Sequence, residues 1–378
     1  MVEDRKQILK LIEDGKITAE EAIILLEKLE KVEISPSEQY QKSEQEEIVQ
    51  ELSTVVDFEN HQNHKREQKS QKQASAKTKF IDFIDSALKK IKDLDLDFNF
   101  GNATEVHHIF FHSNVDINQI ELDVANGSVK LVPWDEKDVR IECDGKVYKV
   151  ESQDEARNTF LQDVLFSIEG GKLTFSVQKK QMKVNSILYI PQTEYEKVKV
   201  RTFNGPISGE KLHVTEFKAK TANGSIDINQ FRSTEIELET ANGHIKAKDC
   251  RSTALDAETI NGTLDVRGSF GKVDLQSFNG NVICSLADYL SHTAHIKTTT
   301  GNIDLYVSGI LAIDGELKSN LGGFKCEVPN MDIVEEKSEV VQKLLRFKAN
   351  SDQSNRLHIF AETKTGSILV KPEGGVNN

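Results

Sequence analysis

Hydrophobic and polar residues alternate with a period of two along the second half of the chain, and this alternation recurs in short blocks. Around residue 220, Phe217 and Ala219 alternate with lysines, an Asn-Gly pair follows, and Ile226 and Ile228 alternate with polar residues. Successive side chains of a strand point to opposite faces, so each block predicts two short strands with one apolar face, joined by a turn. The pattern predicts a mainly β protein.

The turn between the two strands recurs at nearly constant spacing. From Gly205 onward, the glycines lie 19, 19, 19, 18, 21 and 21 residues apart, and the last follows after 44, which is about two periods. This predicts a parallel β-solenoid with two strands per coil of about 19 to 22 residues. The turns should then form a ladder along one edge, with glycine supplying a positive φ. The members of this turn ladder are Asn126, Gly127, Asn204, Gly205, Asn223, Gly224, Asn242, Gly243, Asn261, Gly262, Asn279, Gly280, Gly301, Gly322 and Gly366.

The solenoid is predicted over residues 94–373, and two of its parts fit the period poorly. Between Gly127 and Gly205 lie the strand-like runs KDVRIECDGKVYKV, FLQDVLFSIEGGKLTFSVQKK and NSILYI, which we assign to longer or insertion-bearing coils. Residues 330–355 are polar and unpatterned, so we expect a loop insertion there, before a closing coil with the sequence RLHIFAETKTGSILVKP.

The N-terminal part carries a different pattern. Apolar residues at helical spacing over residues 1–31, interrupted by Gly15, predict a helical hairpin. Residues 32–76 are rich in Gln, Glu, Ser and Lys and predict a flexible polar linker. The hairpin helices expose an apolar stripe, a candidate interaction surface formed by Ile8, Leu11, Ile12, Ile23 and Leu26.

Residues 77–93 predict an amphipathic helix. Its apolar face consists of Phe80, Ile81, Ile84, Leu88 and Ile91. A repeat array needs a cap at its end, so we expect this face to cover the first coil of the solenoid. The alternative is peripheral contact with a membrane surface through residues 80–91, which the lysines of the segment favour and its three aspartates oppose.

Charge and composition restrict the partners and the location. The chain has 48 Lys and Arg against 61 Asp and Glu, a net charge of -13, which repels nucleic acid and anionic lipid headgroups. There is no secretory signal and no apolar run of about 18 residues, so we expect a cytoplasmic protein. The four cysteines are far apart, and Cys284 and Cys326 occupy core columns of the repeat.

The residues contain no pattern that predicts catalysis, and we expect no cofactor, no metal ion and no enzymatic activity. A hydrolase needs two carboxylates facing one cleft, whereas Asp227 and Asp265 should be separated by Lys246 on successive coils. Among the histidines, His108 and His112 would face the same side of a strand, but no acidic or thiol ligand is patterned with them.

The order of the parts resembles a known group of proteins. The hairpin sequence ILKLIEDGKITAEEAIILLEKL, the step KKIKDLDLDFNFG and repeats such as TANGSIDI resemble the YvlB/LiaX group of Gram-positive bacteria. That group joins a SHOCT-like helical hairpin to a DUF4097-type β-solenoid of the kind labelled as an adhesin. The resemblance implies a regulatory or binding role in the response to envelope damage by antimicrobial peptides and antibiotics, without catalysis.

Three hypotheses about function follow. The first is a scaffold of the envelope-stress response that binds a protein partner through the solenoid faces and the hairpin. The second is a carbohydrate-binding or carbohydrate-acting β-helix, which would need aromatic platforms, although Trp134 is the single tryptophan. The third is a filament built by end-to-end stacking of coils, which a capping helix would limit.

Overall fold

The computed structural model describes residues 102–286, 288–339 and 342–373. The predicted hairpin with its apolar stripe, the linker and the amphipathic helix at 77–93 lie outside the described residues. The described part is mainly β, with one α-helix.

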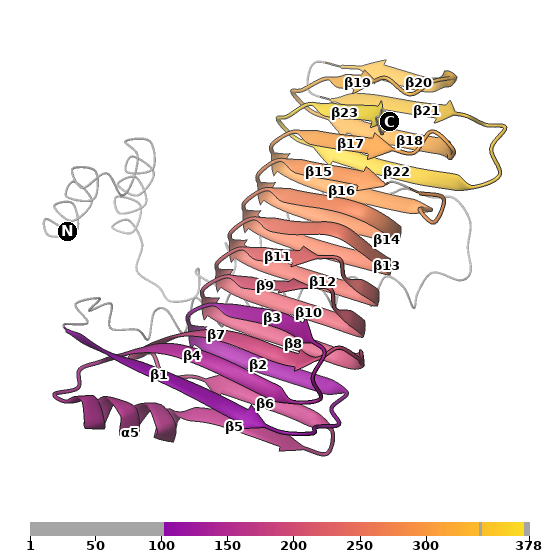
Figure 1. The fold of residues 1–378 in the computed structure, drawn as a ribbon. Helices are drawn as coiled ribbons and strands as arrows, with labels where there is room; N and C mark the ends of the chain where they lie inside the picture. Colours follow the sequence, from indigo (N-terminus) through magenta and orange to yellow (C-terminus); the bar gives the residue numbers. More distant parts are fainter. Residues whose placement is uncertain (1–101, 287, 340–341, 374–378) are drawn as a thin grey trace, which may run out of the picture. The chain divides into compact units, whose positions relative to one another are not determined.

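The strands form two faces of one stack of coils (Figure 1). Most strands within each face are parallel, and the register aligns equivalent residues of successive coils. Strands β13 (Ile245–Asn261) and β14 (Leu264–Asn279) are long enough to contribute to both faces. In spatial order, the first face also contains β5 (Val164–Glu169), β6 (Lys172–Val177), β2 (Gln119–Asn126), β8 (Glu194–Asn204), β10 (His213–Asn223), β12 (Arg232–Asn242), then beyond β14 β16 (Thr293–Thr300), β22 (Arg356–Thr363), β18 (Ala312–Ser319), β21 (Lys343–Ala349) and β20 (Met331–Ser338). The second face contains β1 (Ala103–His112), β4 (Val139–Tyr148), β7 (Met182–Pro191), β3 (Val129–Trp134), β9 (Ile207–Glu210), β11 (Ile226–Asn229), then beyond β14 β15 (Val282–Leu286), β17 (Ile303–Val307), β23 (Ile368–Pro372) and β19 (Phe324–Cys326).

The core lies between the two faces and contains the inward residues of every coil. In a middle coil, Ile236 and Leu238 of β12 and Ile245 and Ala247 of β13 are all fully buried. Complete burial of a leucine or isoleucine side chain stabilises the folded state by about 1.5 to 3 kcal/mol. The repeat supplies such residues in each coil. The alternation in the sequence therefore reports the inward and outward positions correctly.

The Asn-Gly turns lie above one another along one edge of the stack. From Asn204 to Asn279, each asparagine amide donates to the side-chain oxygen of the asparagine in the adjacent coil; for example, Asn223 Nδ2 lies 2.8 Å from Asn204 Oδ1. The chain of amides runs from Asn126 to Asn279, where the hydroxyl of Thr300 donates to the last oxygen at 2.6 Å. A column of Thr and Ser hydroxyls donates to the glycine carbonyls of neighbouring coils, as Thr240 does to Gly224 at 2.9 Å.

The glycines of the ladder are needed mainly for close approach, which differs from the expected reason. A Cβ at Gly243 would lie 1.9 Å from the carbonyl oxygen of Gly224, and the other ladder glycines meet backbone at similar distances. Only Gly127, Gly205 and Gly301 have φ in the positive region, and none of the ladder asparagines does. Stacked backbones at this edge leave no room for a side chain.

The coil of Gly127, the first in the sequence, does not have the next segment of the chain as its neighbour in space. Strand β2 lies between β6 and β8, so the turn of Gly127 packs directly on that of Gly205. Residues 128–204 fold beneath the first coil and, together with β1, form the antiparallel pairs β1–β4, β4–β7 and β5–β6. The expected longer coils are therefore an antiparallel extension of both faces.

The last coil is also out of order. Strand β22 lies between β16 and β18, and Gly366 packs between Gly301 and Gly322. The coil expected to close the stack is therefore internal. The prediction of a loop over 330–355 is wrong, because β20 and β21 form an antiparallel hairpin beside β18. Leu345, Phe347 and Ala349 of β21 are buried, and the Phe347 ring packs against Gly315, so alternate residues of this strand anchor the segment.

A helix that the sequence pattern did not predict covers the N-terminal end of the stack. Helix α5 (Gln153–Asp163) lies beside β1 and β5 (Figure 1) and buries Ala156 and Phe160 completely. Its first turn begins at Ser152, whose side chain accepts from the amide of Glu155, while Glu155 accepts from the amide of Glu151. Residues 160–163 were assigned to a strand-like run, but they are helical because this cap starts a helix ahead of them.

Candidate functional site

The residues considered for catalysis or metal binding do not converge. His107 pairs with Asp144 at 2.6 Å on the surface, whereas His108 packs against Phe110 with ring centroids 4.4 Å apart. Asp227 and Asp265 are separated by Lys246 in the register of the second face. Among the residues that the structure describes, no group of three or more His, Cys, Asp or Glu side chains is placed to hold a metal ion.

The cysteines are residues of the core. Cys143, Cys250 and Cys284 are buried, and Cys326 is partly buried in the short strand β19. Burial raises the pKa of each thiol, to about 11 for Cys250, so the thiolate that a nucleophile requires is disfavoured.

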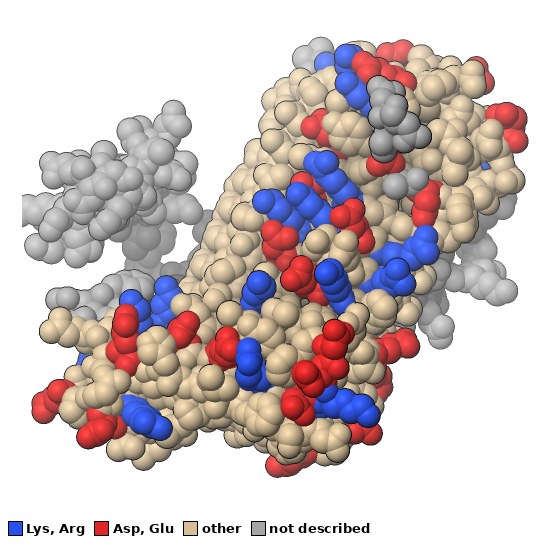
Figure 2. All heavy atoms as spheres, in the orientation of Figure 1, with Lys and Arg blue, Asp and Glu red and all other residues tan. Residues whose placement is uncertain are grey.

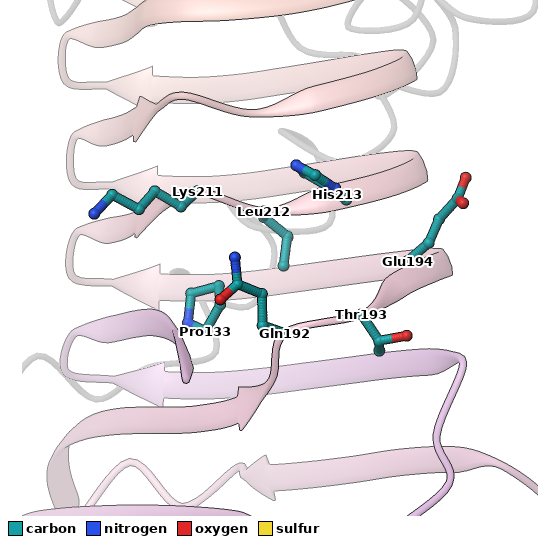
Figure 3. Close-up of a pocket in the computed structure, with 7 residues that line it drawn as sticks. All are labelled: Pro133, Gln192, Thr193, Glu194, Lys211, Leu212 and His213. Carbon is teal, nitrogen blue, oxygen red and sulfur yellow. The ribbon is translucent and has the colours of Figure 1, made fainter. Parts of the chain in front are cut away.

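A small hollow beside the turns that join β7 to β8 and β9 to β10 is a poor candidate for a ligand-binding site. It has a volume of about 110 Å³, and its lining residues are Pro133, Gln192, Thr193, Glu194, Lys211, Leu212 and His213. Figure 3 shows that the side chains of Lys211 and Glu194 point in opposite directions. Ligand pockets usually have about 300 Å³ or more, so this hollow is too small for a typical substrate.

The outward residues of the first face form rows of charge that run from coil to coil. On β8 and β10 these rows are mainly basic, and on β12, β13 and β14 they are mainly acidic. Lys220 bridges the two blocks: its ammonium lies 2.8 Å from Glu237 and 2.6 Å from Glu239. Lys218 pairs with Glu237 at 2.8 Å as well. Figure 2 shows that charges of both signs also mix over the side of the molecule in view.

The acidic block is the most distinctive arrangement of polar groups on the described surface. The register places Glu237, Asp256 and Asp274 side by side on three neighbouring strands, with Glu239 beside Glu258 in the next row. We call these five residues the acidic strip: Glu237, Glu239, Asp256, Glu258 and Asp274. Strands within a sheet are about 4.8 Å apart, so these carboxylates are close enough to repel one another.

The members of the strip differ in how their charge is compensated. Asp274 accepts from His295 at 3.0 Å and from Gln276 at 3.0 Å, and although burial opposes the change, these bonds lower the pKa of Asp274. Within the described part of the chain, no cationic side chain pairs with Asp256. Burial, together with Asp274 and Glu258, raises the pKa of Asp256 to about 8. Burial and the neighbouring Glu237 likewise raise the pKa of Glu239.

The aromatic pair Trp134 and Tyr189 does not form an open platform. Trp134 and Tyr189 lie with ring centroids 5.4 Å apart, and the guanidinium of Arg140 lies over both rings, 5.3 and 4.4 Å from the centroids. A sugar stacks on a free ring face, and here Arg140 occupies one face of each ring.

The acidic strip is visible in the sequence as a column of the repeat, although the prediction of the solenoid did not use the charges of that column. Glu237, Asp256 and Asp274 occupy one outward column, six residues before successive ladder glycines. Stacking of the coils places equivalent positions side by side, so these like charges become neighbours. Lysines occupy the same column in other coils, which made the column read as one of mixed charge. None of the ladder residues lines the small hollow, and the hairpin stripe lies outside the described residues.

The coil stack with its laddered charges defines a two-faced β-solenoid that presents surfaces, a class typical of binding and scaffold proteins. The chain belongs to the Toastrack DUF4097 family, whose model matches residues 117–363. Residues 3–33 match the SHOCT-like domain model. The chain is 48% identical over 371 residues to the uncharacterized protein YvlB of Bacillus subtilis, covering 98% of this chain and 99% of that one. The resemblance to the YvlB/LiaX group is thus confirmed.

Solved structures give a weaker likeness. A "putative adhesin" from Bacteroides fragilis is 12% identical, with a TM-score of 0.32 over 71% of this chain and 97% of that one. A "Putative lipid binding protein" from Parabacteroides distasonis is 11% identical, with a TM-score of 0.32 over 71% of this chain and 97% of that chain. At these scores the likeness supports no functional assignment. Within the described residues, no helix has the length and apolarity required to cross a membrane.

Proposed function

We propose that this protein is a non-enzymatic scaffold of the bacterial envelope-stress response, and that the acidic strip of the first face binds a basic segment of a protein partner. The observation that carries the proposal is Asp256. This carboxyl group lies between Glu237 and Asp274 without a cation of its own, and a Lys or Arg from a partner would favour its ionised form.

The geometry of the face supports a macromolecular partner. The strip spans three strands of a flat face, and its members are held in register by the backbone ladder. Partner binding of this kind depends on surface complementarity and not on a pocket. The helical hairpin at 1–31 provides a second contact for the same assembly, and the protein works in the cytoplasm, with envelope proteins reached from the inner side. The link to envelope stress comes from the resemblance to the YvlB/LiaX group.

A capture experiment tests this role. The tagged full chain is recovered from cells treated with an envelope antibiotic, alongside the variant Asp256→Asn/Glu258→Gln. The control Asp227→Asn/Asp265→Asn removes the same charge from the second face. We expect the natural chain and the control to recover envelope or signalling proteins, with at least fivefold lower recovery by the strip variant. Equal recovery by both variants would remove the strip from the mechanism.

A direct measurement separates the two parts of the proposal. A lysine-rich peptide, titrated with the purified full chain, should bind through the strip and dissociate as salt is raised from about 50 to 500 mM, because salt screens the attraction between the lysines of the peptide and the strip. If the peptide binds but no envelope protein is recovered from cells, the surface is correct and the assigned pathway is wrong.

A further inference from the structure

One part of the second face carries large apolar side chains on its outer side. Phe111 and Ile109 of the edge strand β1 are 56% and 58% exposed, and Ile187 and Tyr189 of β7, on the far side of β4, are partly buried. We call the whole group the outer apolar patch: Ile109, Phe111, Val132, Trp134, Ile187 and Tyr189.

The register shows that β4 lies between the two apolar parts of the patch and places Arg140 and Glu142 between them. Phe111 lies opposite Arg140, which lies opposite Tyr189, which in turn lies opposite Val132. In the next coils along the same face, the equivalent outward positions are polar: Ser208 and Glu210 on β9, then Asp227 and Asn229 on β11. The patch therefore marks a particular region and is not a general property of the face.

Strands that are apolar on both sides are typical of a sheet covered by a second layer. In β7, the buried Leu188 and Ile190 alternate with Ile187 and Tyr189 on the outer side. The charged pair inside the patch does not oppose covering, because Arg140 bonds Glu142 at 2.7 Å and packs over Trp134 and Tyr189. A covering element would bury apolar area over the paired Arg140 and Glu142, whereas the exposed Lys130 opposite Ile187 has to remain in contact with solvent.

The amphipathic segment at 77–93 is the element of the chain best suited to this place. We expected it to cap the first coil, but α5 occupies that end with Phe160. Only residues 94–102 separate the segment from β1, and nine residues span at most about 30 Å. A helix of 17 residues is about 26 Å long, which matches several strands of the patch.

We propose that residues 77–93 dock on the outer apolar patch, with Phe80, Ile84 and Leu88 against β1 and β7. The docked helix forms a second layer over the edge strand β1 and shields its exposed side chains. This intramolecular contact is independent of the partner that the acidic strip binds.

Cross-linking in the full chain tests the contact. The pair Leu88→Cys/Phe111→Cys places one thiol on the apolar face of the segment, and the control pair Ser86→Cys/Phe111→Cys places it on the polar face. Both carry Cys326→Ser, since the remaining cysteines are buried. With oxidised glutathione, we expect the first pair to form an intramolecular disulfide at least tenfold faster. Equal rates overturn the proposal, and so does a disulfide-linked dimer whose yield rises with protein concentration.

The single tryptophan supplies a second readout, because Trp134 belongs to the patch. In Ile84→Gln/Leu88→Gln, we expect the emission to shift to longer wavelength and quenching by iodide to increase at least twofold. The matched variant Ser86→Gln/Lys90→Gln should behave as the natural chain does. Unchanged emission and quenching in the first variant would contradict docking even if the cysteine variants failed to fold.

Discussion

At the scale of single residues, two environments set the behaviour of this protein: the crowded edge of the glycine ladder and the crowded charges of the acidic strip. At the edge, the constraint is steric, because backbone meets backbone. In the strip, the constraint is electrostatic, because stacked coils place equivalent side chains next to one another, and this holds for charged residues as well as for apolar ones. Each environment leads to a measurable prediction.

Replacing a ladder glycine by alanine should be severely destabilising. In Gly243→Ala, the new Cβ would lie 1.9 Å from the carbonyl oxygen of Gly224, so the coils must separate locally. We expect the free energy of unfolding to fall by roughly 3 kcal/mol or more. The control is Gly309→Ala, where a Cβ meets nothing within 4 Å. Urea denaturation checks both, and similar midpoints would show that the ladder tolerates side chains.

Removing the charge of Asp256 should stabilise the protein at alkaline pH. Its pKa is about 8 in the folded state, against about 3.9 for an ordinary aspartate, so the folded state binds the proton more tightly. The destabilisation is absent below about pH 4, grows as pH rises, and is complete above about pH 8.

We therefore expect Asp256→Asn to raise the free energy of unfolding by about 1 to 2 kcal/mol at pH 9, allowing for screening by solvent, and to have little effect at pH 4. Thermal unfolding at both values checks this. Asp227→Asn is the control, because Asp227 neighbours Lys246 instead of other carboxylates. A benefit of equal size at pH 4 and pH 9 would refute the assignment.

At the scale of elements, the two ends of the stack are closed by devices that differ from the repeat. Helix α5 covers one end, and the hairpin of β20 and β21 extends the other. An end coil has a neighbouring coil on one side only, and each of these elements covers the side that would otherwise be open. Terminal units of repeat proteins are atypical for this reason. The α5 cap also limits end-to-end stacking at that end.

The cap depends on one aromatic side chain. Phe160 lies on the inner side of α5 and is fully buried, whereas its neighbour Leu161 in the same helix is 41% exposed. Phe160→Ala should lower the free energy of unfolding by about 3 to 5 kcal/mol, and Leu161→Ala by less than about 1. Hydrogen exchange should show the loss of protection first in β1, β4 and β5, which α5 contacts. Uniform loss across all coils would mean that the end is not a local unit.

At the scale of the whole molecule, the chain inserts one coil out of order near each end of the stack. The first coil lies between strands that follow it by some 50 to 75 residues, and the last coil lies between two earlier ones. These insertions connect segments that are distant in sequence, so the described residues should unfold more cooperatively than a simple linear array.

Truncation tests this topology. Ending the chain after residue 350 removes β22 and β23, an internal coil on which β16 and β18 both depend. We expect this chain to be insoluble or to lose at least half of the amide protection of β16 to β18. Ending it after residue 373 removes only five residues and should change neither property. A soluble, protected product from the first truncation would contradict the internal position of the last coil.

The sequence by itself determined the period, the inward columns, the turn row and the absence of a catalytic motif. These follow from local alternation and from spacing, which every coil repeats. Tertiary structure alone decided the order of the coils at the two ends and the antiparallel extensions. The physical reason is that parallel and antiparallel strands share the same alternation, so only the backbone hydrogen bonds between distant segments select which edges meet.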